Sequence, residues 1–322
     1  LMQPARTYLQ IVGGFCILNA LIPICSSYLR AFGFSKEPLY ASIIGNVINF
    51  CLNAFFLFVL HKGVAGVATA TVISRIINLV IVVMLGAVLV KAKQHPERES
   101  NREVMGQIIR IGLPSACETA IYNVSMTLVI RFLNQMDAQG LNVTARSYTM
   151  QITNFSYCVG AALAQANAIM TGWRIGAKEY DACDRGTRKA AIIGVIVAVI
   201  LETMFALCSG WIMQLFSKDP QMVSLVGKLL AIDIVLEMGR VTNLVYGQAL
   251  KTSGDAVFPV VMGACFMILC SVGGTYLFGI RLGLLAVGAY IGMAGDECVR
   301  AVGMYLRWKS GKWKEKGLVK SR

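Results

Sequence analysis

Long apolar runs, separated by short polar segments, make up most of the chain. Nine of these runs are long enough to cross a hydrocarbon core of about 30 Å, which takes about 20 residues of helix. A membrane barrel would instead show short strands of alternating polarity, so each run is predicted to be a helix. The predicted spans are 7–29, 38–60, 64–90, 106–133, 147–171, 189–215, 222–250, 257–280 and 284–307.

Composition supports a polytopic membrane protein. Of the 322 residues, 56% are hydrophobic and only 15% are charged, which is too apolar for a soluble domain of average usage. The ten cysteines are scattered without the spacing of metal ligands, and no Walker motif is present. We therefore expect neither an enzyme nor a cofactor-binding protein.

Positive charge gathers on one side of the predicted membrane. The net charge is +13, and twenty Lys and Arg residues fall in the segments of one side against six on the other. The positive-inside rule makes the first side cytoplasmic, including 91–110, 174–189 and the C-terminus. The tail "RWKSGKWKEKGLVKSR" is predicted to be an interfacial anchor beside anionic lipid and not a nucleic-acid site.

An internal repeat organises the chain. Residues 29–49 align without gaps on residues 250–270, and the similarity continues weakly between 63–74 and 283–294. Each copy is a helix end, a basic glycine turn and a proline that opens the next helix. The aligned pairs are Arg30 with Lys251, Gly33 with Gly254 and Pro38 with Pro259. The copies enclose six predicted spans, an even number, which predicts two parallel six-helix repeats.

The repeat predicts four parts. Residues 106–307 form a complete six-helix C-terminal lobe, whereas 1–90 supply only the last three helices of the N-terminal lobe. Three helices of that first lobe are therefore expected to be missing. Residues 91–105 are predicted to be a cytoplasmic linker, and 308–322 a basic cytoplasmic tail.

Three charges interrupt the apolar run at 229–251. Asp233, Glu237 and Arg240 stand at i, i+4 and i+7, so they form one polar stripe on a helix. Each charge costs about 2.5 to 3.5 kcal/mol at the bilayer centre on insertion scales, so the stripe needs compensation. Arg240 can neutralise one carboxylate and leave the other for a cation. The structural alternative is a buried ion pair that only fixes helix orientation.

A second stripe surrounds Glu118. Pro114 removes a helical hydrogen bond one turn before it, and Tyr122 and Ser125 follow at i+4 and i+7. Such a stripe must face protein or a wet cavity, because lipid cannot satisfy it. Its own helix offers Glu118 no cation, which favours a functional role.

Other polar residues within the spans allow both functional and structural interpretations. Asp296 and Arg300 stand at i, i+4 with Glu297 beside them, and are predicted to form an internally neutral, structural pair. Asp255 is predicted to be a cap or turn residue. The small polar residues that either line a cavity or join helices are Asn123, Gln165, Asn167 and Asn243.

Three segments resemble the multidrug and toxic compound extrusion (MATE) family of transporters. They are "IGLPSACETAIYN", "GWRIGAKEYDACDRGTRKA" and "DIVLEMGRVTNLVYGQALKTSGDAVFPV". The resemblance covers nearly the whole chain, as the fourth to twelfth helices of a twelve-helix protein, and is strongest to a bacterial branch that includes flavin exporters. Trp173 departs from the Gln or Arg that relatives often have at this point.

The resemblance implies an all-α, MATE-like membrane fold with nine of its twelve transmembrane helices in this chain. It implies a V-shaped pair of lobes that alternates between outward and inward openings, with solute export driven by Na⁺ or H⁺ entry. The implied cation-binding carboxylates are Glu118 and, on the tenth helix, Asp233 or Glu237. Supporting or cavity positions are Tyr122, Asn123, Gln165, Arg240, Asn243, Asp296 and Arg300.

The expected function is therefore a cation-coupled antiporter of the bacterial inner membrane. It would export organic solutes such as cationic drugs, dyes or flavins, as a monomer in full-length form, with the lipid bilayer and no nucleic acid as partner. No metal is expected beyond a possible Na⁺ at Glu118, Asp233 and Glu237. Two alternatives remain: a lipid-linked oligosaccharide flippase of the same superfamily, which needs several cationic residues in its cavity, and a non-transporting membrane fragment.

Overall fold

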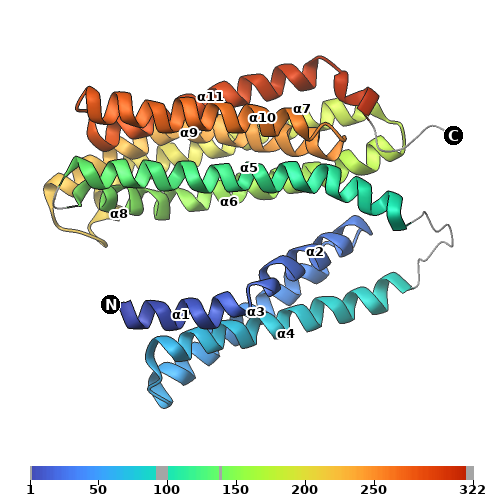
Figure 1. The fold of residues 1–322 in the computed structure, drawn as a ribbon, viewed down its shortest axis with the longest axis horizontal. Helices are drawn as coiled ribbons and strands as arrows, with labels where there is room; N and C mark the ends of the chain where they lie inside the picture. Colours follow the sequence, from blue (N-terminus) through green and yellow to red (C-terminus); the bar gives the residue numbers. More distant parts are fainter. Residues whose placement is uncertain (1, 92–100, 138–139, 317–322) are drawn as a thin grey trace. The chain divides into compact units, whose positions relative to one another are not determined.

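Helices account for all the regular secondary structure that is described. The structure, a computed structural model, describes residues 2–91, 101–137 and 140–316, and every ordered element in these ranges is a helix, as predicted. The chain forms two compact units, Leu1–Arg98 and Glu99–Arg322 (Figure 1). Residues 92–100 of the predicted linker and 317–322 of the predicted tail lie outside the described residues.

The first unit is built around its longest helix. Its elements are α1 (Met2–Gly14), α2 (Ile17–Ala31), α3 (Lys36–Ala54), the π-helical η1 (Phe55–Val59) and α4 (Gly63–Lys91). A 43° bend separates α1 from α2. Both of these helices and α3 pack on α4. The buried core is apolar, so it holds the unit by burial of Leu29, Ala41, Val82 and Val90.

The second unit has one helix at its centre. Its elements are α5 (Asn101–Met136), α6 (Leu141–Gly176), α7 (Tyr180–Leu207), α8 (Ser209–Met213), α9 (Pro220–Thr252), α10 (Val257–Phe266), the π-helical η2 (Met267–Val272) and η3 (Thr275–Arg281), α11 (Leu285–Lys309) and the 3₁₀ turn η4 (Lys312–Lys316). The long helices run along one common direction (Figure 1). α9 packs against α6, α7 and α11, whereas α5 lies against α10 and η2. Polar groups on α9 therefore face protein on several sides.

The two turns of the internal repeat have the same backbone structure. Gly33 and Gly254 have φ angles of 89° and 91°, a region that favours glycine. In both turns the amide after the glycine donates to the carbonyl five residues before it, at 3.0 and 2.9 Å. This is the Schellman pattern that ends helices. Pro38 and Pro259 are the third residues of the helices that follow.

Fewer helices are both long enough and apolar enough to cross a membrane than the nine spans that the sequence pattern predicts. Among the described residues, Lys36–Val59, Gly63–Val90, Tyr180–Leu207 and Val257–Arg281 qualify, and the bent pair of α1 and α2 makes a fifth if it is one span. The other predicted spans do form long helices, α5, α6, α9 and α11. Polar side chains keep these helices from qualifying, and several of these side chains are buried inside the unit, among them Asp233, Glu237, Asp296 and Arg300. The count of nine spans therefore stays a prediction.

The two tail tryptophans are core residues and not interfacial anchors, which corrects the prediction for this segment. Trp308 and Trp313 are 2% and 1% exposed, and their rings stack with centroids 4.2 Å apart. Trp308 donates to Asp184 of α7 at 2.8 Å, and Trp313 donates to the Trp308 carbonyl at 3.0 Å. The start of the tail is thus packed against α7.

Asp255 fastens the turn between α9 and α10 to the end of the chain. The residue that precedes α10 is Ala256, which has no side-chain cap, so Asp255 has the predicted role of a turn residue and not that of a cap. Its carboxylate instead pairs with Arg307 and Lys316, each at 2.7 Å. Burial alone would raise the pKa of Asp255, but the hydrogen bonds and charges of these two cations lower it below its usual range.

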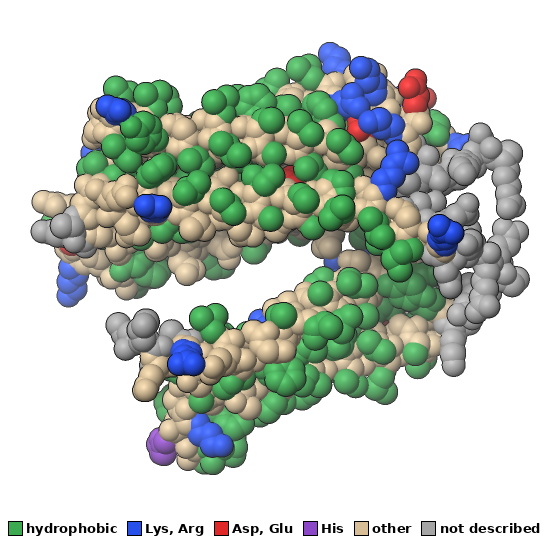
Figure 2. Space-filling model, viewed as in Figure 1, with side chains coloured by type: hydrophobic (Ala, Val, Ile, Leu, Met, Phe, Trp, Pro, Cys, Tyr) green, Lys and Arg blue, Asp and Glu red, His purple; other side chains and the backbone are tan. Residues whose placement is uncertain are grey.

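These contacts bring several predicted cytoplasmic segments to one end of the second unit. The start of α7, the turn after α9 and the end of α11 meet there. Lys and Arg side chains gather over the same end (Figure 2). Hydrophobic side chains are spread along the helices elsewhere on this face, as a lipid-facing surface requires (Figure 2).

The backbones of η3 and α11 approach each other through glycines. A Cβ added at Gly288 would lie 2.4 Å from the backbone carbon of Phe278, and one at Gly292 would lie 2.9 Å from backbone atoms of Gly274 and Cys270. Gly295 of the same helix has nothing within 4 Å of such a Cβ. Small residues are the usual means of close helix approach in membranes.

Gly288→Ala should therefore lower the free energy of unfolding by about 1 to 3 kcal/mol, because backbone atoms must separate. Gly295→Ala, on the same helix, should be neutral or slightly stabilising, since alanine is the better helix former. Thermal unfolding of the purified chain in detergent measures both. Equal effects of the two variants would contradict the close approach.

The Asp255 pairs should give stability an acid-sensitive component. Because the folded pKa of Asp255 lies below its unfolded value of about 3.9, the contribution is fully present above that value and is lost as pH falls through the folded pKa. Asp255→Asn should cost about 2 kcal/mol at neutral pH. Unfolding followed over an acidic pH series checks this. A variant as acid-sensitive as the parent chain would overturn the assignment.

Candidate functional site

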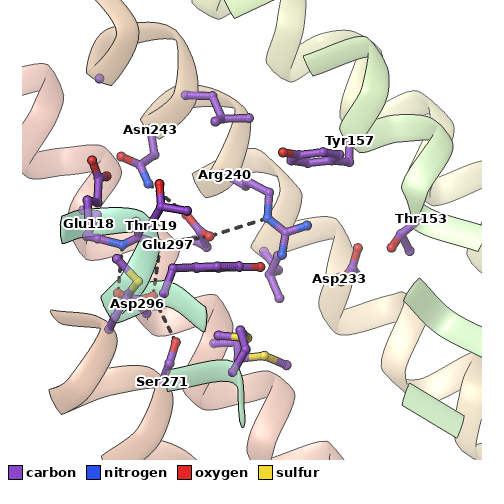
Figure 3. A pocket seen from close by; sticks show the side chains of 18 of the residues that line it. Glu118, Thr119, Thr153, Tyr157, Asp233, Arg240, Asn243, Ser271, Asp296 and Glu297 are labelled. Atoms are coloured by element: carbon purple, nitrogen blue, oxygen red, sulfur yellow. Dashed lines mark hydrogen bonds and ion pairs between the residues drawn. The ribbon is translucent and has the colours of Figure 1, made fainter. Parts of the chain in front are cut away.

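A charged cavity of about 460 Å³ lies inside the second unit (Figure 3). Its walls come from α5, α6, α9, α10, η2 and α11. Tyrosine and methionine side chains supply much of the apolar lining: Tyr122, Tyr157, Tyr290, Met126, Met150, Met267, Met293 and Met304. Four carboxyl groups and four cationic groups also line it: Glu118, Asp233, Asp296, Glu297, Arg146, Arg240, Lys251 and Arg300.

Arg240 stands at the centre of the charged lining. Its guanidinium forms an ion pair with Glu237 one turn earlier on α9. It also reaches Glu297 of α11, with 3.5 Å between Nε and Oε1, and its free side faces the ring of Tyr157 of α6 at 5.9 Å. Figure 3 shows Arg240 between Glu297 and Tyr157. The predicted stripe thus faces protein, and Arg240 joins three helices.

Two carboxyl groups of the stripe are incompletely compensated. Asp233 is 3% exposed and Glu237 is fully buried, yet Asp233 Oδ2 and Glu237 Oε2 have no hydrogen-bond partner among the described residues. Asp233 and Thr153 both line the cavity on the α6 side (Figure 3). A desolvated carboxylate without a partner is costly, so these atoms favour a bound proton or cation.

Glu297 ties α11 to the stripe, a role that the sequence interpretation missed. It pairs with Arg300 at 2.9 Å as well as with Arg240, and it accepts a hydrogen bond from Asn243 of α9 at 3.0 Å. Gly239 permits this, since a Cβ there would lie 2.8 Å from the backbone of α11. The signal in the sequence was the i, i+3 spacing of Glu297 and Arg300.

The predicted pair of Asp296 and Arg300 forms but is not isolated. Arg300 Nε lies 2.9 Å from Asp296 Oδ1, and Ser271 of η2 donates to the other carboxylate oxygen at 2.9 Å. Arg300 also serves Glu297. Within the described residues, the cluster on α9 and α11 therefore has four carboxyl groups and two guanidinium groups. Two formal negative charges are left over if all of them ionise.

Glu118 has a cation partner, contrary to the reasoning from its own helix. Lys251 in the last turn of α9 places Nζ 2.6 Å from Glu118 Oε2. In the sequence Lys251 stood out only as the basic residue of the second glycine turn, aligned with Arg30. Its side chain reaches into the cavity, where it lines the wall together with Glu118.

Other predicted residues divide into those inside and outside the cavity. Tyr122 and Asn243 line it, whereas Glu237 lies behind the lining. Asn123 is exposed and donates within its own helix to the Thr119 carbonyl, so it does not serve the cavity. Gln165 is exposed on α6 and is also absent from the described lining.

Glu202 of α7 is a buried acid that sequence reasoning missed. It is fully buried, and neither carboxyl oxygen forms a hydrogen bond of good geometry within the described residues, although the Ser156 side chain of α6 lies near it. It lies close enough to Asp233 and Glu237 to interact with them electrostatically. A single acid in the apolar run of α7 was the available signal. No set of three His, Cys, Asp or Glu side chains in the described ranges is arranged to hold a metal ion.

The second unit is a bundle of helices with a charged cavity between them, and the cavity is large enough for a small organic solute. Ionisable residues inside a membrane bundle mark a path or a binding site for solutes or ions. The MatE family profile matches residues 114–277, which include Glu118 and most of the cavity walls. The chain belongs to this multidrug and toxin extrusion family of transporters.

A named relative agrees with this assignment, and a solved structure has the same fold. The uncharacterized transporter YisQ of Bacillus subtilis is 34% identical over 325 residues, covering 99% of this chain and 71% of YisQ. A probable multidrug resistance protein NorM of Thermotoga maritima is 23% identical, covering 98% of this chain and 68% of NorM. The structure of a MOP superfamily transporter from Pyrococcus furiosus matches with a TM-score of 0.85 at 18% identity, over 96% of this chain and 70% of that one.

Removing the carboxyl group of Glu202 should stabilise the protein. Glu202→Leu should raise the free energy of unfolding by about 1 to 3 kcal/mol, because an unpaired buried polar group is lost. Glu297→Leu is the matched control and should lower it, since it leaves two arginines short of a partner. Tm values of the purified variants measure both. A Glu202→Leu chain as unstable as the control would contradict the orphan assignment.

Proposed function

We propose that this chain forms the ion- and substrate-binding lobe of a cation-coupled antiporter that exports organic solutes by alternating access. The observation that carries the proposal is the cluster on α9 and α11 beside the cavity, in which four carboxyl groups share two guanidinium partners. Asp233 is the central residue, because it combines cavity exposure with a buried unpaired oxygen. The coupling ion in this proposal is H⁺ or Na⁺.

Coupling follows from competition for negative charge. A proton or Na⁺ at Asp233, with Glu237 behind it, removes the charge that attracts an organic cation. Ion and solute then exclude each other, and each favours the conformation to which it binds more tightly. Arg240 holds Glu237 and Glu297 in place in both states, so the variable charge is confined to the unpaired groups.

The cavity suits an organic solute. Its volume of about 460 Å³ falls in the range of small-molecule sites. Methionine and tyrosine side chains give adaptable apolar contact with rings of varied shape. NorM of Thermotoga maritima and YoeA of Bacillus subtilis carry the description of probable multidrug resistance proteins. Cationic drugs, dyes and flavins are therefore the first solutes to test, the last because of the flavin-exporter branch.

The proposed location is the cytoplasmic membrane of a bacterium, with the C-terminus inside and a monomer as the functional form. The gathering of Lys and Arg at the end of the second unit that contains α11's last turn supports this orientation (Figure 2). YisQ is itself a bacterial protein.

A lipid-linked oligosaccharide flippase is the second candidate, and one observation bears on it. Arg146 and Lys251 join Arg240 and Arg300 in the lining, so the cavity has more cations than the sequence suggested. Three of these four are already paired with carboxylates. A diphosphate group would have to break those pairs, which favours the organic cation.

Binding of tetraphenylphosphonium to the purified chain tests the proposal. Affinity should fall by about tenfold when Na⁺ is added or pH is lowered, which is a coupling within the usual 1 to 3 kcal/mol. Asp233→Asn should weaken binding and abolish this ion dependence, whereas Asp219→Asn, at the exposed start of α9, should preserve both. Ion-independent binding, or no effect of Asp233→Asn, would refute the mechanism.

Dye efflux from proteoliposomes under a proton or Na⁺ gradient separates the antiporter from a non-transporting membrane fragment. Ion-dependent binding with gradient-driven efflux supports the antiporter. Binding without efflux supports the fragment.

A further inference from the structure

The contact between Glu118 and Lys251 joins two helices across the wall of the cavity. Glu118 lies on α5 and Lys251 in the last turn of α9, and their charged atoms are 2.6 Å apart. This is the length of a strong, charge-assisted hydrogen bond. The two side chains are 18% and 20% exposed, so the pair is partly desolvated while still open to a ligand in the cavity.

The surroundings of Glu118 leave Lys251 as its direct partner. Gly263 of α10 brings that helix close, since a Cβ there would lie 3.4 Å from the Glu118 carboxyl group. Arg300 interacts with Glu118 electrostatically, but its own contacts are to Asp296 and Glu297. Among the described residues, Lys251 is therefore the cation that forms an ion pair with Glu118.

Lys251 can move away from Glu118 more easily than an arginine could. Its ammonium sits on a flexible four-carbon stem with three donors, unlike the planar guanidinium of an arginine. Its position in the last turn of α9 places it beside helix carbonyls, which interact favourably with a cation. When another cation binds the Glu118 carboxylate, the Lys251 ammonium can therefore move to the carbonyl groups at the end of α9.

We propose that Lys251 is a specificity-determining residue, a tethered ammonium that occupies Glu118 and must be displaced by the cationic group of the solute. This rests on the proposed function. In this proposal the carboxylate of Glu118 is already paired with Lys251 before the solute or the coupling ion binds. An organic monocation gains Glu118 only by competing with Lys251, so the lysine lowers the affinity for such ligands.

The proposal is tested by tetraphenylphosphonium binding to the purified chain. Lys251→Gln should raise affinity by about tenfold, because it frees a partly buried carboxylate. Lys251→Arg should keep the pair and bind no more tightly than the parent chain. Lys312→Gln removes an exposed lysine from the tail with the same change in net charge and should leave affinity unchanged.

A double variant separates the direct effect from a structural one. Glu118→Gln combined with Lys251→Gln should lose the gain seen with Lys251→Gln alone, because no carboxylate is left to be freed. A purely structural lysine would instead give weaker binding and a lower Tm in the single variant. Unchanged or weaker binding by Lys251→Gln, while Asp233→Asn still abolishes ion dependence, would overturn this inference and leave the proposed function standing.

Discussion

The guanidinium of Arg240 is the interaction on which the interior of the second unit depends. It joins α9 to α11 through Glu297 and holds Glu237 on its own helix, while its open side faces Tyr157 of α6. Hydrocarbon offers no solvation for these groups, so the acids are tolerable only because the arginine is there. The closeness of α9 and α11 at Gly239 brings the charges within reach. The close packing of α9 on α11 is therefore the same feature that allows Arg240 to compensate the charge of Glu297.

That arrangement also explains which features the sequence could predict. The two glycine turns follow from spacing along the chain, and they were confirmed. The helix ends were predicted less well, since the predicted span 7–29 is divided between α1 and α2, and the predicted span 189–215 between α7, which begins at Tyr180, and α8. Partners on other helices do not follow from spacing. Lys251 is 133 residues from Glu118, and only the fold brings them together. Glu202 was missed for the same reason, because one acid in an apolar run has no pattern until its neighbours are known.

The basic tail shows where composition misleads. Tryptophan beside lysine is typical of a membrane interface, yet Trp308 and Trp313 stack on each other in the core and hydrogen-bond inward. The lysines in the described part of the tail remain at the surface, and one of them, Lys316, also pairs with Asp255. The prediction is therefore wrong about the role of the aromatic rings. The partner of Trp308 is Asp184, a half-buried acid on α7 that is distant in the sequence and could not be predicted from it.

The π-helical segments have a consequence for how such a chain can change length. Each copy of the internal repeat begins and ends at a glycine with positive φ. The first copy runs from Gly33 to Gly63, and the second runs from Gly254 to Gly283 and is one residue shorter. The copies also differ in π-helical content, since η1 stands in the first and η2 and η3 in the second. A π turn holds more residues than an α turn, so it can take up an insertion or deletion without breaking the helix. Such segments let a membrane helix alter its register, and hence the side chains it turns toward the interior, while both of its ends stay in place.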